Sequence, residues 1–353
     1  MTTNNKTTRR LPKSSFRHAA TAAAALTLLA SATAAHAGQI LLVNAIDQVN
    51  GGIATYRYAA DGSGNFSASS RTLVTTDLRN NNWLVNGPST GTVPYLWETD
   101  AFGGIKRYST SGTSQQYVQA AVGFANNQSQ SVEDSSGNAY VRIFSNSSSG
   151  HNGAIEKFDT SVTGTLLVAT QGSGLAIGPD GNIYQANWIQ GNQSTGSIEK
   201  YSTSGTDLGQ FAAYSGNTPT ELGFDSHGDL FALIGNTRID EWGPTGSYIG
   251  TFKSGLPNTL GGGRAQDPNS MAIDGNDNIW LAQGYGSLYK ISPTGTVTNF
   301  DLSNSGLAAY SVAILNTGNA APEPSTALLL AGAGLLFAGR GRKLVHRFNK
   351  SSL

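Results

Sequence analysis

The chain has 353 residues, only 12% of them charged, and it contains no cysteine. Ten of its 22 lysines and arginines lie in residues 1–37 and 340–353, where there is no acidic residue, so residues 38–339 hold 12 basic and 22 acidic side chains and carry about −10. This excludes nucleic acid as a partner, because such binding neutralises phosphates with Lys and Arg, and the missing cysteines exclude disulfides, thiol catalysis and thiolate metal sites.

Residues 1–37 predict a secretory signal peptide. Five basic residues precede an apolar run over 19–30, and Ala35, His36 and Ala37 form the small-x-small pattern of a cleavage site before Gly38. The alternative is an amphipathic helix of the mature domain. We expect export by the secretion machinery and a mature chain that begins at Gly38.

A repeated unit organises residues 38–318. It reads small residue, Ile, variable residue, basic residue, aromatic residue, and a Thr-Gly turn follows most copies. Copies occur at 104–108, 154–158, 197–201, 238–242 and 287–291, with a weaker one at 52–56. Counted from Ile53, successive copies start 52, 50, 43, 41 and 49 residues apart, which is the length of a four-stranded propeller blade.

A polar turn and a strand with an aromatic residue precede each later unit. The aromatics are Tyr140, Tyr184, Phe231 and Trp280, and short apolar strands at 175–177, 222–224 and 271–273 precede the last three turns. Asp, Asn and Gly occupy the turns because tight turns need left-handed conformations and side chains that bond their own backbone. Each blade is therefore predicted to contain an inner, a second, a third and an outer strand.

This pattern resembles the NHL-type and related six-bladed propellers over residues 39–316. Residues 39–43 read as a second strand with no inner strand before it, and residues 310–315 read as an inner strand with nothing after it. Joined, they make one blade, and such closure leaves no free edge between the first and last blades. The predicted fold class is all-β, a single six-bladed β-propeller with split-blade closure. Five or seven blades stay open because residues 72–102 are irregular.

The aromatic residues fall into repeated and unrepeated positions. The repeated set predicts packing between blades rather than a sugar-stacking array, and it comprises Tyr108, Tyr140, Phe158, Tyr184, Tyr201, Phe231, Trp242 and Trp280. Trp83, Trp97 and Trp188 lie outside this register near loops. These three tryptophans are the candidates for ligand contact.

Polar residues that start the inner strands are expected at the mouth of the central channel. They are Asn82, Ser129, Ser173, Thr220, Glu221, Asn269 and Ser270. Some propeller lactonases and related hydrolases bind a divalent cation there with Glu, Asn and Asp side chains, and hard cations need several oxygen ligands. Glu221 and Asn269, with Asp267 beside them, are the tentative metal ligands. The alternative is a polar, water-filled channel with no cofactor.

Two further patterns favour structure over chemistry. Asp274, Asn276 and Asp277 lack the spacing and the terminal Glu of an EF-hand, so they predict a hairpin turn. His151 and His227 are the histidines of the predicted exported part, and neither is expected to have a Ser or Asp partner for catalysis.

Three features follow one another at the C-terminus. Pro322, Glu323 and Pro324 come first, an apolar stretch over 325–339 follows, and then a cluster that includes Arg340, Arg342 and Lys343. A helix of this stretch is about 22 Å long, short of the ~30 Å hydrocarbon core. The basic cluster is expected to stay on the cytoplasmic side of the membrane.

This order resembles the PEP-CTERM sorting signal. In that family an exosortase recognises the tail and cuts near Pro-Glu-Pro, and the protein is released or transferred to the surface of Gram-negative bacteria that make exopolysaccharide. The resemblance covers about residues 320–347 and implies a sorting tail over 319–353. The alternative is a simple C-terminal membrane anchor. The family shares a sorting route and not an activity.

The sequence therefore predicts an exported, exosortase-sorted cell-surface or extracellular-matrix protein. Its propeller is expected to be a binding or structural module rather than an enzyme, with exosortase, a transient contact with the inner membrane and a polysaccharide as partners. One alternative is a metal-dependent hydrolase or lyase that acts on a lactone or saccharide in the channel. Another is a matrix component with no small ligand.

Overall fold

The structure is a computed structural model. It describes residues 39–47, 53–75, 83–86, 95–99, 104–109, 114–119, 131–143, 153–159, 163–170, 172–189, 192–216, 219–235, 237–256, 268–283, 287–302 and 307–316. These residues form 24 strands. Within these ranges no helix is long and apolar enough to cross a membrane. The predicted signal cleavage site and the predicted sorting helix lie outside them.

The strands form four-stranded antiparallel meanders, which we number as blades in chain order. Blade 1 contains β24 (Leu307–Asn316), β1 (Gln39–Asp47), β2 (Ile53–Ala60) and β3 (Phe66–Thr75). Blade 4 contains β12 (Leu175–Ile177), β13 (Ile183–Ile189), β14 (Asn192–Tyr201) and β15 (Asp207–Ser215). Blade 5 contains β16 (Pro219–Phe224), β17 (Leu230–Ile234), β18 (Arg238–Trp242) and β19 (Tyr248–Ser254). Blade 6 contains β20 (Pro268–Ile273), β21 (Ile279–Gln283), β22 (Leu288–Ile291) and β23 (Val297–Phe300).

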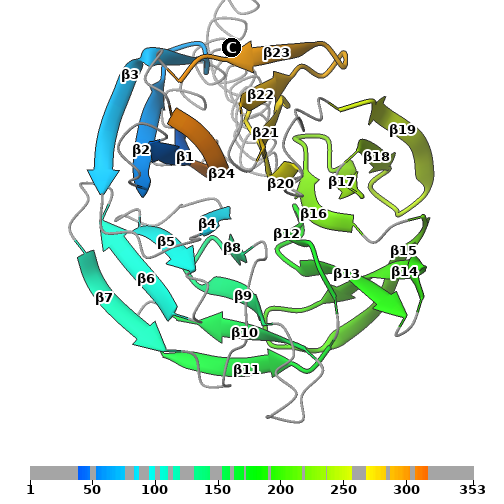
Figure 1. The fold of residues 1–353 in the computed structure, drawn as a ribbon. Helices are drawn as coiled ribbons and strands as arrows, with labels where there is room; N and C mark the ends of the chain where they lie inside the picture. The colour runs from blue at the N-terminus through cyan, green and yellow to red at the C-terminus, as the bar shows by residue number, and fades with distance from the viewer. Residues whose placement is uncertain are drawn as a thin grey trace, which may run out of the picture. The chain divides into compact units, whose positions relative to one another are not determined.

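Blades 2 and 3 are joined in one eight-stranded sheet. Blade 2 contains β4 (Trp83–Asn86), β5 (Tyr95–Thr99), β6 (Gly104–Ser109) and β7 (Ser114–Gln119), and blade 3 contains β8 (Ser131–Glu133), β9 (Ala139–Ile143), β10 (Ala154–Phe158) and β11 (Gly164–Val168). The inner strands β4 and β8 pair in parallel, with Val85 opposite Ser131 and Asn86 opposite Val132. The arrangement is thus a propeller of six four-stranded units around one axis (Figure 1), which confirms the predicted fold.

The split blade closes the ring. Strand β1 pairs with β2 on one side and with the last strand, β24, on the other, and Gln39 lies opposite Asn316. Figure 1 shows β24 at the centre of the ring beside β1, although the two strands stand at opposite ends of the sequence. The predicted split-blade closure is confirmed, and β1, the first strand of the described residues, is paired on both edges.

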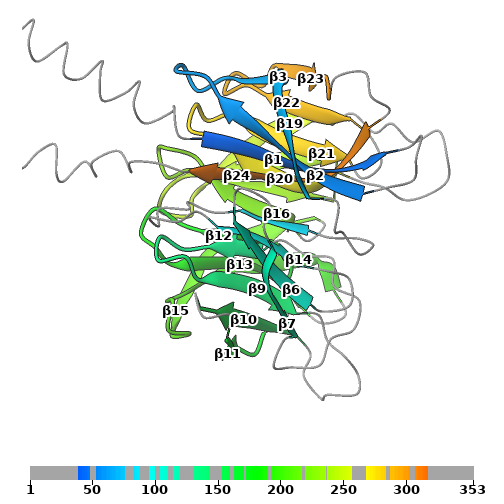
Figure 2. The same cartoon turned by 90° about the vertical axis from the view of Figure 1, so that its left-hand side faces the viewer.

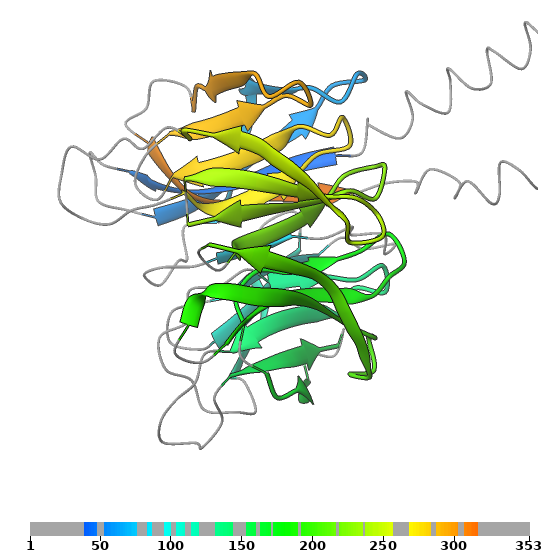
Figure 3. The same cartoon turned by 90° about the vertical axis from the view of Figure 1, so that its right-hand side faces the viewer.

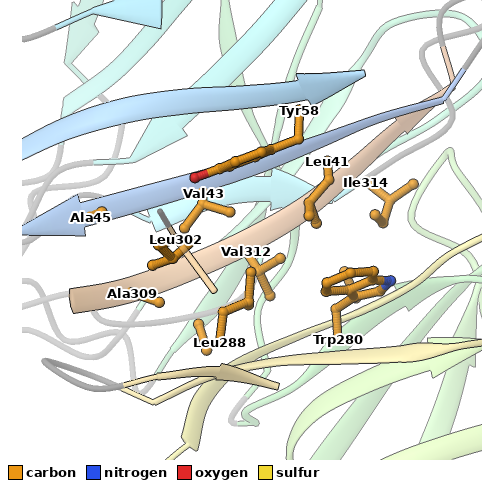
Figure 4. Close-up of a cluster of buried hydrophobic side chains, with 12 residues drawn as sticks. Leu41, Val43, Ala45, Tyr58, Trp280, Leu288, Leu302, Ala309, Val312 and Ile314 are labelled. Atoms are coloured by element: carbon orange, nitrogen blue, oxygen red, sulfur yellow. The ribbon is translucent and has the colours of Figure 1, made fainter. Parts of the chain in front are cut away.

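Hydrophobic clusters fill the space between neighbouring blades. One cluster joins blades 6 and 1 and includes Trp280, Val312, Leu41 and Tyr58, whose side chains converge between the two sheets in Figure 4. The indole of Trp280 packs edge-on against Phe66 and Phe300 at centroid distances of 5.5 and 5.1 Å. Burying such rings contributes much of the stability of a sheet protein without disulfides.

The repeated aromatics take part in this packing, as predicted. Seven of them are buried, with at most 7% exposed: Tyr140, Phe158, Tyr184, Tyr201, Phe231, Trp242 and Trp280. The side chain of Tyr108 lies outside the described residues. Basic side chains of the third strands lie over the aromatic rings of the second strands, as Lys157 does over Tyr140 and Lys200 over Tyr184.

One side of the propeller, which we call the turn face, carries the turns from inner to second strands and from third to outer strands. Antiparallel meanders place both kinds of turn at the same end. The strands of blades 4 to 6 run between this face and the opposite one (Figures 2 and 3). Gln39, at the start of β1, also lies on the turn face, because its Oε1 accepts a hydrogen bond from Gly275 N in the turn of blade 6 at 3.1 Å. Asn316 pairs with Gln39, so both described ends of the chain leave from this face.

Candidate functional site

The inner strands present the polar side chains that the sequence placed at the channel mouth, and three of these side chains bond to the next blade. Ser173 Oγ donates to Pro219 O of β16. Glu221 Oε2 accepts from Met271 N of β20 at 3.5 Å. Ser270 Oγ donates to Val312 O of β24 at 3.0 Å and accepts from Val312 N at 3.1 Å. With the parallel pair β4 and β8, these bonds link four of the six pairs of neighbouring inner strands.

Glu221 is the only tentative metal ligand whose side chain is described. It is 2% exposed, and burial raises its pKa well above the usual value, although the Met271 N–H and the charge of Arg142 oppose that shift. Arg142 of β9 is also buried, and burial lowers its pKa to about 9 against the charge of Glu221. The matching positions in blades 4, 5 and 6 are Ala186, Leu233 and Ala282. Arg142 therefore brings a cation to a position that is otherwise apolar.

The remaining predicted channel residues are only partly described. Thr220 Oγ1 donates to Leu233 O at 3.4 Å within blade 5. Asn269 lies in β20 next to Ser270, but its side chain is outside the described residues, as are Asn82, Ser129 and Asp267 entirely. The metal site at Glu221 and Asn269 stays a prediction.

The three candidate tryptophans are placed by backbone alone. Trp83 in β4 lies opposite Thr99, and Trp97 in β5 lies opposite Arg107, so both belong to blade 2. Trp188 in β13 lies opposite Gly196 at a register shift of blade 4. Their role in ligand contact stays a prediction.

Two amide side chains of β13 have buried atoms without a hydrogen-bond partner among the described residues. Gln185 is fully buried, and neither its Oε1 nor its Nε2 has a hydrogen-bond partner among the described residues. Asn187 uses its Nδ2 on Thr170 and Tyr201, but its Oδ1 has no such partner within the same ranges. Buried amides of this kind normally bind water or a ligand.

The turns between inner and second strands confirm one sequence prediction and correct another. Asp274 Oδ1 accepts from Asn276 N and Asn278 N, which fixes the chain between β20 and β21 in a hairpin turn, as predicted.

The prediction that His227 has no Asp or Ser partner is wrong. Its Nδ1 lies 3.5 Å from Asp225 Oδ2 and 3.5 Å from Asp277 Oδ2, and Ser226 Oγ is equally near. Asp277 comes from the next blade, so this proximity depends on the packing of blade 6 against blade 5. His151 lies outside the described residues.

Comparison with protein families concerns the C-terminal segment. The family model described as the PEP-CTERM protein-sorting motif matches residues 320–343. The chain carries a PEP-CTERM sorting motif. The match includes the predicted sorting residues Pro322, Glu323, Pro324, Arg340, Arg342 and Lys343. The PEP-CTERM motif marks the chain for export and for exosortase-mediated sorting to the cell surface or the extracellular space.

No protein of curated function matches the chain. Solved structures with a similar fold include a streptogramin B lyase at 16% identity and a TM-score of 0.44, which aligns over 66% of this chain and 73% of the lyase. A gluconolactonase from Xanthomonas campestris aligns at 12% identity and a TM-score of 0.48 over 72% and 86% of the two chains. A protein of unknown function from Bacteroides caccae aligns at 14% identity and a TM-score of 0.49 over 78% and 98%. At such identities the likeness concerns the fold and not the activity.

Proposed function

We propose that the propeller of this PEP-CTERM protein is a rigid, non-catalytic binding or structural module of the cell surface or extracellular matrix, associated with exopolysaccharide. One observation carries the proposal. Three polar side chains of the inner strands and the residues just before them, where a channel enzyme holds its reacting groups, are used for contacts between blades instead, because Ser173, Glu221 and Ser270 each bond to the backbone of the next blade.

The charge and the aromatic residues of the chain limit the class of polysaccharide that it can bind. Residues 38–339 carry about −10, so a polyanionic polymer is repelled, and a neutral glycan is the better partner. Sugars are bound by aromatic stacking and by neutral hydrogen-bonding groups. Trp83, Trp97 and Trp188 provide aromatic residues. The buried Gln185 and the half-buried Asn187, whose amides have atoms that bond to no described residue, lie on the same strand as Trp188.

The alternative is a metal-dependent hydrolase or lyase that acts on a lactone or saccharide. One feature favours it, the raised pKa of the buried Glu221, because a carboxylic acid that stays protonated can donate a proton. Arg142 counts against a divalent cation at this position, because a buried cation repels a second one.

Thermal unfolding of the full chain with a panel of bacterial polysaccharides tests the proposal. A ligand that binds only the folded state at about 100 times its dissociation constant adds about 2.7 kcal/mol of stability. We expect a neutral glycan to raise the unfolding temperature in chelator, and Trp188→Ala to reduce that shift. Tyr248→Ala, which removes an exposed aromatic from the outer strand β19, is the matched control.

A second assay measures hydrolysis of lactones with and without divalent cations. Cation-dependent turnover that is lost in Glu221→Gln would overturn the proposal in favour of the enzyme. If neither a glycan shift nor turnover is found, the binding function is wrong and a matrix role without a small ligand replaces it.

A further inference from the structure

The turn aspartates of blades 3, 4 and 6 share one set of hydrogen-bond donors. In blade 3, Asp134 Oδ2 accepts from Asn138 Nδ2 and from Tyr140 OH, each at 2.8 Å. In blade 6, Asp274 accepts from the amide of Asn278 and from Trp280 Nε1. Each aspartate therefore receives an amide donor and an aromatic donor from the second strand, which satisfies the carboxylate that these tight turns bury.

In blade 4 a glycine, Gly178, occupies the position of Asp134 and Asp274, and the aspartate stands two residues later, where it receives the same kinds of donor and also a cation. Asp180 Oδ2 accepts from Asn182 Nδ2 at 2.9 Å and from Tyr184 OH at 3.0 Å, and Lys200 Nζ lies 2.6 Å away. Lysines occupy the position of Lys200 in blades 3 and 6 as well, where Lys157 and Lys290 lie over the aromatic rings. Blades 3, 4 and 6 thus share an amide donor, an aromatic donor and a lysine around the turn, and in blade 4 the lysine forms an ion pair with the aspartate.

Blade 5 replaces all three. Asp229 stands in place of the Asn, Phe231 in place of the Tyr or Trp, and Glu241 in place of the Lys. Phe231 has no hydrogen-bond donor, and Asp229 and Glu241 can donate to a carboxylate only when they are protonated. When ionised, the two acids add negative charge. The turn aspartate of blade 5, Asp225, thereby loses the donors that the other turn aspartates have.

Asp225 is left with one carboxylate oxygen that accepts no hydrogen bond from the turn. Its side chain is 9% exposed. Oδ1 accepts from His227 N and Asp229 N at 2.9 and 2.8 Å, as in the other turns. For Oδ2, the ring of His227 at 3.5 Å is the only partner among the described residues. Oδ2 is not among the buried side-chain atoms without a partner, so a cation from solvent can reach it.

Blade 6 contributes a second carboxylate to the same place. Asp277 has φ 58°, a left-handed conformation, and the matching turn positions of blades 3, 4 and 5 are Gly137, Gly181 and Gly228. Ser226 donates to Asp277 through N and Oγ, both at 2.8 Å. The side chain of Asp277, 18% exposed, is thereby held 3.5 Å from His227 Nδ1.

The neighbouring acidic groups add to the negative potential at this place. Burial and the charge of Asp225 raise the pKa of Asp229, with His227 opposing. Burial and the charges of Asp229 and Asp225 raise the pKa of Glu241. Asp229 and Glu241 therefore add their charges to that of Asp225, and no Lys or Arg forms an ion pair with these carboxylates in the described part of the chain.

From this geometry we propose that Asp225, His227 and Asp277 bind a divalent transition-metal ion of the Zn²⁺ type, which links the turns of blades 5 and 6. One ligand atom from each residue lies within 4.8 Å of the others. Tetrahedral Zn²⁺ with bonds of about 2.1 Å places its ligand atoms about 3.4 Å apart, close to the two distances of 3.5 Å from His227 Nδ1. Imidazole favours Zn²⁺ over Ca²⁺ and Mg²⁺, which prefer oxygen ligands only.

The site differs from the tentative channel site in place and in chemistry. It lies on the turn face, and its ligands come from the loops that follow the inner strands, whereas Glu221 lies within an inner strand.

The competing explanation is a protonated His227 that forms a simple ion pair with the two aspartates. That arrangement needs no metal and is screened by salt.

Isothermal titration of the metal-free full chain with Zn²⁺ tests the proposal. We expect saturable binding of one ion and a higher unfolding temperature with Zn²⁺ than with Ca²⁺ or Mg²⁺. His227→Gln should weaken Zn²⁺ binding at least tenfold, because it removes the imidazole from an exposed position. Asp277→Gly should have the same effect and keep a cooperative unfolding transition, since glycine occupies the matching turns.

Two controls make the outcome decisive. His151→Gln removes the other histidine of residues 38–339, and Glu221→Gln removes the tentative channel ligand; both should leave Zn²⁺ binding unchanged. If His227→Gln and Asp277→Gly bind Zn²⁺ like the unchanged chain, or if no saturable binding occurs, the site does not exist and the ion-pair explanation holds. The result is independent of the glycan and lactone assays.

Discussion

Single residues of the turns decide the local charge balance of each blade. A turn aspartate with an amide, an aromatic donor and a lysine is compensated, as Asp180 is by Asn182, Tyr184 and Lys200. The same backbone turn with Asp229, Phe231 and Glu241 gathers uncompensated carboxylates. A few substitutions in a repeat thus convert a structural turn into a candidate ion site while the fold stays the same.

The carboxylate of Asp180 is expected to contribute to the free energy of unfolding in a way that depends on pH. Burial raises its pKa, but bonds from Lys200, Asn182 and Tyr184 outweigh burial and lower it from 3.8 to about 2. The folded state therefore favours the ionised form, and this contribution is present above about pH 4 and is lost as the pH falls towards about 2. Asp180→Asn should lower the free energy of unfolding by about 1 kcal/mol at pH 7, since the group is partly exposed.

Denaturant unfolding at a series of pH values measures this effect. The difference between the unchanged chain and Asp180→Asn should shrink as the pH falls from about 4 to about 2. Asp207→Asn, at an exposed aspartate of β15, is the control and should show no such trend. A difference that stays constant with pH would show that the charge of Asp180 contributes nothing.

Two glycines at matching turn positions separate conformational strain from steric contact. Gly246 and Gly295 have φ of 83° and 78°. A Cβ at Gly246 would overlap the backbone oxygen of Phe211 in the neighbouring blade 4, whereas nothing lies within 4 Å of one at Gly295. We expect Gly295→Ala to cost about 1 kcal/mol through the left-handed conformation alone, and Gly246→Ala to cost at least about 2 kcal/mol more. Equal losses in urea unfolding would contradict the close packing of blades 4 and 5.

At the scale of elements, the inner strands act as links between blades. Ser270 is the clearest case, because its buried hydroxyl satisfies both Val312 O and Val312 N. Ser270→Ala should destabilise the protein by about 2–4 kcal/mol, since two buried backbone groups lose their partner. The exposed Ser204→Ala is the control, with a change below about 0.5 kcal/mol. An unfolding free energy equal to that of the control would mean that water replaces the hydroxyl.

Much of the element scale could be predicted from the sequence. The blade repeat predicted the strand order, the turns and the split blade, because each blade is a local meander whose pattern depends only on its own residues. The parallel pairing of β4 with β8 could not be predicted, since it joins two blades through a few backbone bonds that leave no side-chain pattern.

The candidate sites show the same limit. Glu221 was found by its position in an inner strand, but Arg142 is in another blade, and its charge matters only in the closed ring. The partners of His227 were missed for a similar reason, because Asp277 belongs to the next blade. The sequence does contain one indication of this site. Glu241 occupies the position at which the repeat otherwise has a basic residue, and an alignment of the repeats shows this exception.

At the scale of the whole molecule, sorting and folding are separate properties. The propeller closes between Gln39 and Asn316, and the PEP-CTERM motif begins at residue 320, after the last strand. Replacing Pro322, Glu323 and Pro324 by alanine should therefore leave the unfolding temperature unchanged. The uncut chain should accumulate in the inner-membrane fraction, because exosortase no longer recognises the tail.

Cell fractionation and calorimetry test this prediction together. Asp207→Asn, which changes an exposed residue of the propeller and keeps the tail intact, is the control and should reach the surface normally. Normal delivery of the triple variant to the surface would mean that the apolar and basic parts of the motif suffice. A lowered unfolding temperature would mean that the tail also stabilises the propeller.

The pairing of β1 with β24 has a consequence for the order of folding. Strand β1 is synthesised long before β24, the last strand of the described residues, so the ring cannot close until the chain has been made as far as Asn316. A chain that stops early leaves the buried edge of β1 open and is exposed to proteolysis and aggregation. Closure thus distinguishes complete chains from truncated ones, and a closed ring is found only in chains that have been made as far as the sorting signal.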